Sequence, residues 1–171
     1  PANCDTAEVD LVIAAAAIVA TDDDFTGTPV TGLAGGDTAT VFTNDTLNGV
    51  AFANGDVTAS ITIDGGLTGV SINADGTLTI PAGTAAGNYT VTYEICEVLN
   101  PANCDTAEVD VTVAAAAIVA TDDDFTGAPV NGLAGGDTAT VFTNDTLNGV
   151  AFANGDVTAS ITIDGGLTGV S

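Results

Sequence analysis

The sequence predicts an all-β sandwich that is repeated along the chain with a period of 100 residues. Residues 1–71 recur as residues 101–171 with five differences in 71 positions, which indicates a tandem array of whole domains. Within one period, segments of strand character follow one another about every ten residues and show no convincing helical period. A period of this length also matches the usual size of a domain and is long enough to enclose a core.

Short segments rich in β-branched and apolar residues alternate with turns in the middle of the repeat. Their composition and length are typical of strands. The turns between them contain Asn-Gly, Asp-Gly-Gly and Ala-Asp-Gly, because glycine and asparagine adopt the left-handed backbone that tight turns need. The predicted strands are Thr38–Thr43, Val57–Ile63, Val70–Asn73 and Thr77–Ile80, and the turns lie at 48–49, 64–66 and 74–76.

A hairpin is the most regularly patterned part of the repeat. Residues 89–96 alternate between apolar and polar, and the alternation resumes over residues 104–113 after the turn-rich segment 99–103. Cys96 and Cys104 both fall on the polar faces of their strands. A disulfide between them would staple the outer face of the hairpin, and closing so short a loop would stabilise the fold by roughly 2–3 kcal/mol.

The repeat also explains the odd number of cysteines. Cys4 is the copy of Cys104 one period earlier, and the copy of Cys96 would fall five residues before Pro1. We therefore expect Cys96 to pair with Cys104, and Cys4 to have a partner upstream of residue 1. Metal ligation is the alternative, but two cysteines without histidine do not make a zinc site. A disulfide indicates an oxidising compartment and hence export.

An alanine-rich segment, Ala14–Ala17, joins one repeat to the next. Propensity alone would allow a helix, but the segment directly follows a strand that ends near Ile13, so we expect an extended connector. It contains no glycine, proline or serine, which predicts a short, stiff connection. The predicted boundaries give the last strand of one repeat at 1–15, a complete repeat at 16–115 and the first part of another at 116–171.

The composition excludes several classes of function. The chain has 23 acidic residues and no lysine, arginine or histidine, so nucleic acid and anionic lipid are not expected as partners. Without histidine or lysine there is no Ser-His or Cys-His system, and we do not expect an enzyme. The longest apolar run, Leu11–Ala20, is half the length that spans a bilayer. A hydrophobic fraction of 46% nevertheless predicts a folded chain.

Acidic clusters near the start of each repeat are the best candidate metal ligands. Adjacent carboxylates repel one another unless a cation intervenes, and hard oxygen ligands favour Ca²⁺. The run from Asp22 echoes an EF-hand loop, but its twelfth position is Leu33 instead of glutamate. We expect either a calcium site at the junction between repeats or a solvated acidic loop. The candidate ligands are Asp22, Asp23, Asp24, Asp122, Asp123 and Asp124, with Asp10, Asn44, Asp45, Asp110, Asn144 and Asp145 as further candidates.

Two parts of the repeat resemble known adhesins. Residues 87–107, Gly-Asn-Tyr-Thr-Val-Thr-Tyr-Glu-Ile-Cys-Glu-Val-Leu-Asn-Pro-Ala-Asn-Cys-Asp-Thr-Ala, resemble the repeats of giant Bacteroidetes cell-surface adhesins, especially the SprB-type mobile adhesins of gliding motility. Residues 20–25 and 41–46 are similar to the start of bacterial Ig-like and cadherin-like adhesin repeats. The resemblance implies Ig-like β-sandwiches joined end to end as a rod, exported to the surface of a Gram-negative bacterium, with a role in adhesion or gliding.

Asp-Thr-Ala and Asp-Thr-Leu triplets recur along the chain and resemble the O-glycosylation motif that Bacteroidetes use on exported proteins. Some matches arise by chance in a chain rich in threonine and aspartate. The candidate threonines are Thr6, Thr38, Thr46, Thr106, Thr138 and Thr146.

These observations predict a structural stalk that extends a distal binding domain from the cell. Its partners would be the neighbouring repeats and an external surface or glycan reached through that domain. With strands of up to roughly ten residues at about 3.3 Å each, plus loops, one repeat would advance the rod by about 40 Å. The alternatives are repeats that bind glycan themselves, or lateral assembly into a sheath or surface layer. Tyr89 and Tyr93 are expected on the core face, which leaves no aromatic platform for sugar and favours the stalk.

Overall fold

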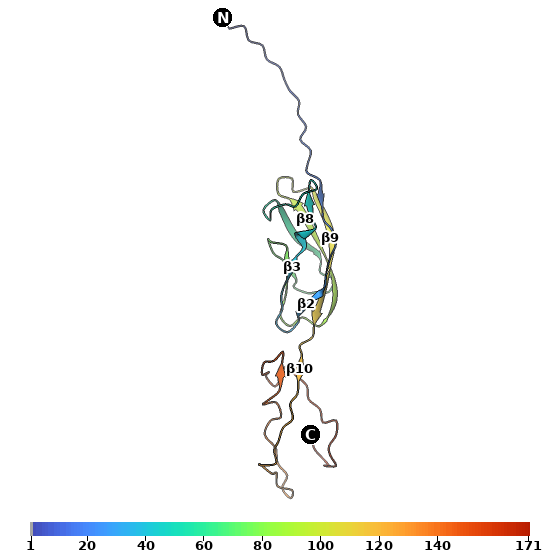
Figure 1. Ribbon diagram of the computed structural model, residues 1–171, viewed down its shortest axis with the longest axis vertical. Coiled ribbons are helices and arrows are strands. Elements are labelled where there is room, and N and C mark those ends of the chain that lie inside the picture. The colour runs from blue at the N-terminus through green and yellow to red at the C-terminus, as the bar shows by residue number, and fades with distance from the viewer. Residues whose placement is uncertain (1) are drawn as a thin grey trace. The chain divides into compact units, whose positions relative to one another are not determined.

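The computed structural model of the chain describes residues 2–171 and is all-β (Figure 1). It divides into two compact units, unit 1 ending at Ala115 and unit 2 from Ala116 to Ser171. The regular elements of the described residues are strands and one short 3₁₀ helix, Val41–Thr43, joined by turns and loops. In this part of the chain no helix has the length and apolar character needed to cross a membrane.

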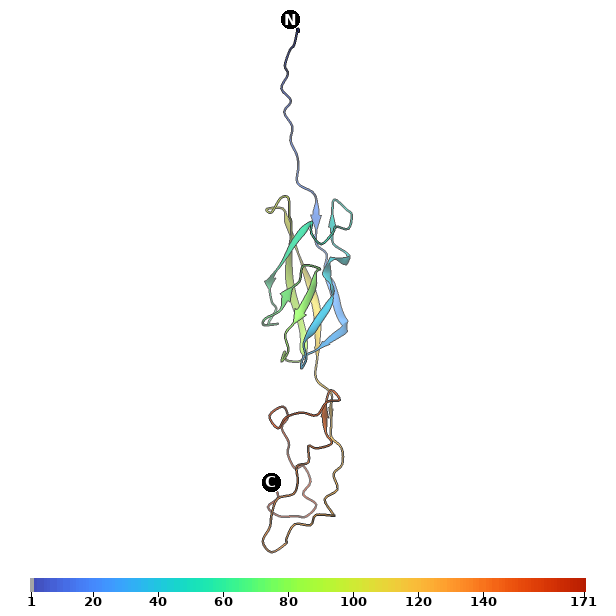
Figure 2. The same ribbon diagram turned by 90° about the vertical axis from the view of Figure 1, so that its left-hand side faces the viewer.

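Two sheets enclose the core of unit 1, as in a β-sandwich (Figure 2). One has the strand order β2-β9-β8-β5 and the other the order β3-β7-β6, while β1 and β4 form a separate pair. The strands are β1 (Ile18–Val19), β2 (Asp23–Thr31), β3 (Gly36–Thr40), β4 (Thr46–Leu47), β5 (Val57–Ile63), β6 (Ser71–Ile72), β7 (Thr77–Ile80), β8 (Gly87–Glu97) and β9 (Cys104–Ala114).

The predicted hairpin is confirmed as β8 and β9, and its apolar face forms much of the core. The alternating pattern buries one residue in two on each strand, because successive side chains of a strand point to opposite faces. The polar residues between them lie on the outer face. Buried hydrophobic residues of the hairpin are Val91, Tyr93, Ile95, Ala107, Val109, Val111 and Val113, and β7 contributes Leu78 and Ile80 from the other sheet.

The predicted disulfide is also present. Cys96 and Cys104 lie directly opposite each other in the β8–β9 register, with their Cα atoms 4.1 Å apart. The backbone N–H of Glu97 donates to the carbonyl of Asn103 and closes the turn. Cys4 lies in the exposed segment 2–15 and is a free cysteine in this structure.

The strand β2, which runs parallel to β9, was not predicted from the sequence. Asp23 aligns with Val109 and Thr31 with Ala114, with a register irregularity between Phe25 and Val30. Glycine and proline within β2 weaken its strand propensity and are compatible with an irregular edge strand. One edge of β9 is paired with β8, and β2 pairs with the other edge.

Two other predicted strands are shorter than expected. The segment Thr38–Thr43 is divided, because β3 ends at Thr40 and residues 41–43 form the 3₁₀ turn. The Thr40 hydroxyl caps this turn by accepting from the backbone N–H of Phe42 at 3.2 Å. The segment predicted at residues 70–73 narrows to β6, whereas β5 and β7 have the predicted bounds.

Segments of nearly identical sequence differ in structure between the two units. In unit 2, β10 (Ile118–Val119) pairs with β11 (Thr146–Leu147), as β1 pairs with β4. Residues 123–131 and 157–163, the copies of β2 and β5, form no strand. In unit 1 those strands pair with β9 and β8, and residues 116–171 contain no copy of that hairpin. Residues 2–15 are likewise exposed and without strand, and the connector at 14–17 is not helical, as predicted.

Candidate functional site

The carboxylates of the first acidic cluster point to three different partners. Asp22 Oδ1 accepts from the backbone N–H of Glu108 at 2.9 Å, whereas Asp24 Oδ1 accepts from the N–H and hydroxyl of Thr26 at 2.9 and 2.6 Å. Asp23 points inward, with its Oδ2 3.3 Å from the hydroxyl of Tyr93. Because a strand directs successive side chains to opposite faces, neighbours in sequence separate in space. The structure therefore does not bring the three carboxylates together.

The hydroxyl of Tyr93 is the centre of a buried polar cluster. Its oxygen lies 3.1 Å from Asp45 Oδ2, 3.3 Å from Asp23 Oδ2 and 3.3 Å from the carbonyl oxygen of Thr21. Asp45 is buried and also accepts from the N–H of Thr21 at 2.8 Å. The alternating pattern predicts that the Tyr93 ring lies in the core, but it gives no signal for the partners of the hydroxyl.

Burial changes the acid–base behaviour of this cluster. Burial and the nearby charge of Asp45 raise the pKa of Asp23 to about 6, and burial also raises the pKa of Asp45. The same burial, with both carboxylates nearby, holds the pKa of Tyr93 well above its ordinary value. A protonated Asp23 would donate to the Tyr93 oxygen while Tyr93 donates to Asp45, so one added proton satisfies all three groups.

The segment that leads into β2 is tied to β9 by side-chain carboxylates. The N–H of Ala20 donates to Asp105 Oδ2 at 2.9 Å, and the N–H of Glu108 donates to Asp22 at the same distance. Both contacts lie before the first residue pair of the β2–β9 ladder, Asp23 with Val109. They therefore extend the contact between the two segments toward the start of the repeat.

The connector is anchored to the domain that follows it. The N–H of Ala17 donates to Asn48 Oδ1 at 2.9 Å, and the N–H of Asn48 donates back to the carbonyl of Ala17 at 2.7 Å. Asn103 Nδ2 donates to the carbonyl of Ala16 at 2.7 Å and to Glu97 Oε2 at 2.8 Å. Asn48 has a positive φ of 53° in its Asn-Gly turn, a conformation that asparagine tolerates better than most residues. The Asn-Gly turn was predicted, but its contact with the connector was not.

The same anchor recurs in unit 2, and it shows how little chain separates the units. Asn148 and Ala117 exchange two hydrogen bonds of 2.8 Å. At the end of unit 1, the N–H of Gly32 donates to the carbonyl of Ala114 at 2.9 Å. The chain between the last anchored residue of unit 1 and the first anchored residue of unit 2 is thus Ala115 and Ala116 alone.

The remaining candidate metal ligands are dispersed. Asp110 lies on the outer face of β9, in register with Asp24, and accepts from the Thr90 hydroxyl at 2.6 Å. Asn44 and Asn144 donate to the carbonyls of Asp22 and Asp122 at 3.1 and 3.2 Å. Asp10, Asp122, Asp123 and Asp124 are exposed, and Asp145 is buried and accepts from the N–H of Thr121.

Among the described residues, a single group brings at least three cysteine, aspartate or glutamate ligand atoms close to one another. It consists of Glu94, Cys96 and Cys104, whose ligand atoms lie within 4.8 Å of one another. The two cysteines are joined to each other in the disulfide, so the group leaves only the carboxylate of Glu94 for an ion. The described residues thus contain no group of three side-chain carboxylates whose oxygens already lie close together.

The candidate glycosylation threonines differ in accessibility. Thr6, Thr106 and Thr138 are exposed, whereas Thr38, Thr46 and Thr146 are half-buried. The hydroxyl of Thr38 accepts from the N–H of Leu78 at 3.0 Å, so that side chain is engaged in the fold. Thr106 is therefore the most accessible candidate on a strand of unit 1.

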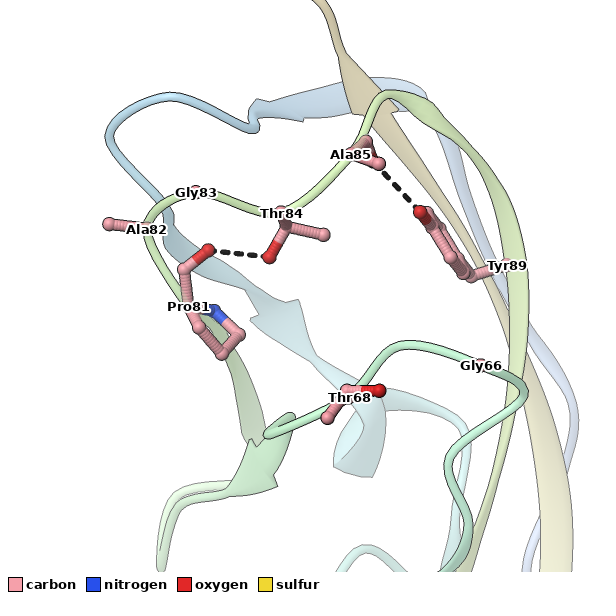
Figure 3. A pocket seen from close by; sticks show the side chains of 8 residues that line it. All are labelled: Gly66, Thr68, Pro81, Ala82, Gly83, Thr84, Ala85 and Tyr89. Carbon is pink, nitrogen blue, oxygen red and sulfur yellow. Dashed lines mark hydrogen bonds between the residues drawn. The ribbon is translucent and has the colours of Figure 1, made fainter. Parts of the chain in front are cut away.

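A hollow of about 270 Å³ lies among the loops of unit 1, with Tyr89 as one wall (Figure 3). The Tyr89 hydroxyl donates to the carbonyl of Ala85 at 2.8 Å, and the Thr84 hydroxyl donates to that of Pro81 at 2.6 Å. Tyr89 is half-buried, so it is more accessible than the core position predicted from the alternation. The lining residues include no carboxylate and no cysteine, and their polar side chains are hydroxyls, those of Thr68, Thr84 and Tyr89.

Comparison with known proteins does not identify a relative. No protein-family model matches the chain, and no curated protein matches it either.

Proposed function

We propose that residues 16–115 form one repeat of a tandem array of Ig-like β-sandwiches, and that the array is the stalk of a very large exported adhesin. The supporting observation is that the chain is anchored at opposite ends of β9. Asn103, next to the start of β9, holds Ala16, and Gly32 holds Ala114 at its end. β9 has 11 residues, which at about 3.3 Å each span roughly 35 Å. Each repeat would therefore advance the chain and not return it to its starting point.

The short connector supports a stiff stalk. Two residues, Ala115 and Ala116, cover at most about 7 Å when extended. Neither is glycine, so the backbone has less conformational freedom than in a flexible linker. Together with the span of β9, the connector gives an advance of about 40 Å per repeat.

The disulfide supports export. A disulfide such as Cys96–Cys104 forms and persists in oxidising compartments. The proposed location is the surface of a Gram-negative bacterium, where the stalk would serve adhesion or gliding through a distal domain. The partners of the repeats themselves would be the neighbouring repeats.

Calcium at the junction between repeats stays a proposal for the longer array. Within unit 1, Asp22 and Asp24 accept hydrogen bonds through Oδ1, so Oδ2 is the oxygen that each offers to an ion. The neighbouring outer-face carboxylates of Asp24 and Asp110 are the simplest starting pair. Calorimetric titration of an array with CaCl₂ tests this, and an unchanged heat in Asp24→Asn would exclude that pair.

Electron microscopy of arrays of residues 16–115 with increasing copy number tests the spacer function. The proposed stalk predicts thin particles whose length grows by about 40 Å for every added repeat. Compact particles, in which the length grows with roughly the cube root of copy number, would refute it.

The hollow at Tyr89 favours one alternative, in which the repeats themselves bind glycan. An aromatic ring beside polar loops is a common way to hold a sugar, because the ring packs on the apolar face of the sugar. Glycan-array binding that is lost in Tyr89→Ala, with folding retained, would support this alternative. Absence of binding by the parent chain would leave the spacer function.

A further inference from the structure

The first long strand and the last strand of unit 1 are hydrogen-bonded neighbours that run in the same direction (Figure 1). Tension along the chain would act on unit 1 at Ala16 and at Ala115, the residues before β1 and after β9. The upstream pull draws β2 toward its N-terminal end, and the downstream pull draws β9 toward its C-terminal end. Because the strands are parallel, these forces slide one strand along the other and load their hydrogen bonds together.

The pairing of β2 with β9 has two blocks. Residues 23–25 pair with 109–111, and residues 30–31 pair with 113–114, on either side of the register irregularity. Val109, Val111 and Val113 are buried behind the ladder. Water therefore reaches the core side of the bonds poorly, and bonds shielded from water are harder to replace during rupture.

Two carboxylates add bonds of the same kind upstream of the ladder. Asp105 accepts from the N–H of Ala20, and Asp22 accepts from the N–H of Glu108, each at 2.9 Å. Each bond links the segment that leads into β2 to β9, so sliding of the strands would load it. Hydrogen bonds to an ionised acceptor are about twice as strong as neutral ones.

We infer that the β2–β9 pair, together with Asp22 and Asp105, is a mechanical clamp that keeps the repeat folded under tension. The inference rests on the proposed stalk function, since a stalk transmits force between a distal binding domain and the cell. The disulfide supports the clamp from the other side of β9, because it ties the first residue of β9 to β8. In this clamp, Asp22 and Asp105 hold the backbone N–H groups of Glu108 and Ala20 under load.

Single-molecule pulling of the full chain tests the clamp. Cys4 is free and exposed and provides the upstream attachment through a thioether, and the C-terminus provides the other. Unit 1 events are recognised by adding reductant, because only unit 1 contains the disulfide. With the disulfide intact, the extended chain crosses from Cys96 to Cys104 over their Cα–Cα distance of 4.1 Å. After reduction it crosses through 8 peptide links of roughly 3.5 Å each, which lengthens the unfolding step by about 24 Å.

Two matched variants separate the clamp from general stability. Asp22→Ala removes a carboxylate that accepts from Glu108, and Asp75→Ala removes one that accepts from the N–H and hydroxyl of Thr77 in a turn outside the clamp. Asp22→Ala is expected to unfold about tenfold faster than the parent at constant force, the effect of one hydrogen bond to a charged group. Asp75→Ala is expected to stay within about twofold of the parent, although it lowers equilibrium stability as well.

Equal acceleration in the two variants would overturn the inference, as would a parent unit 1 that unfolds as soon as force is applied. Asp105→Ala is the second clamp variant if Asp22→Ala does not fold, and it carries the same expectation. Electron microscopy measures length without applied force, so an extended array that unfolds easily would refute the clamp alone. A compact array would refute the stalk, whatever force its domains resist.

Discussion

Replacing Tyr93 with phenylalanine isolates the contribution of one buried hydroxyl. The side chain is 0% exposed, and its oxygen lies 3.1 Å from Asp45 Oδ2, on a carboxylate that is only 1% exposed. Without the hydroxyl, Asp45 keeps the N–H of Thr21 as its donor and cannot recruit water easily. A hydrogen bond to a charged group contributes about 1.5–3 kcal/mol, and the distance here is long for a hydroxyl donor. Tyr93→Phe is therefore expected to lower the free energy of unfolding by about 2 kcal/mol.

Urea denaturation of the full chain at pH 7.5, followed by circular dichroism, measures this loss. Tyr89→Phe is the matched control, because it removes a hydroxyl that donates to the carbonyl of Ala85 on a half-buried tyrosine. The control is expected to lose less than about 1 kcal/mol. Equal losses in the two variants, or an unchanged stability in Tyr93→Phe, would refute the central role of the Tyr93 hydroxyl.

Three further predictions concern pH, the disulfide and a turn. The folded-state pKa of Asp23 is raised from 3.8 to about 6, so the contribution of Asp23 to stability is greatest below pH 4 and is lost as pH rises through 6. Urea titrations should show that the stability of the parent, relative to that of Asp23→Asn, falls over that range. Replacing Cys96 and Cys104 with alanine should cost about 2.6 kcal/mol in the same assay, from the nine-residue loop they close. Gly65→Ala should lower the melting temperature sharply, because φ is +59° and a Cβ would lie 1.9 Å from the Thr90 carbonyl oxygen.

Each of these has a control within the chain. Asp24→Asn tests the pH effect, because Asp24 is exposed and its pKa is lowered by hydrogen bonds from Thr26, so the trend should be absent or reversed. Parent protein in reductant should match the double cysteine variant in stability. Gly83 also has a positive φ, +81°, but open space around a Cβ, so Gly83→Ala should cost less than Gly65→Ala. A pH trend common to both aspartate variants, or equal glycine losses, would contradict the respective explanation.

The β8–β9 hairpin could be predicted because its local sequence pattern determines its structure. Strict alternation fixes which side chains are buried, and the same register places Cys96 opposite Cys104. β2 could not be predicted in this way. Its sequence contains glycine and proline, and the copy at 123–131 forms no strand where the hairpin is missing. The strand is thus produced by tertiary pairing with β9 and not by local propensity.

The candidate site also combines features that follow from local sequence with features that depend on distant contacts. Three consecutive aspartates suggested one shared ion, but strand geometry sends Asp23 to the core and its neighbours to the outer face. The partners that matter lie far along the chain, such as Glu108 for Asp22. Contacts of this range depend on the completed sheet order, which spacing in a single sequence does not reveal.

Small-angle scattering on arrays of residues 16–115 tests the spacer function most directly. The proposed stalk predicts a cross-section that stays constant while the maximum dimension rises by about 40 Å for each added repeat. The measurement should be made in CaCl₂ and again in chelator, since rigidity that requires calcium would support a calcium site between repeats. A cross-section that grows with copy number in both conditions would contradict the stalk.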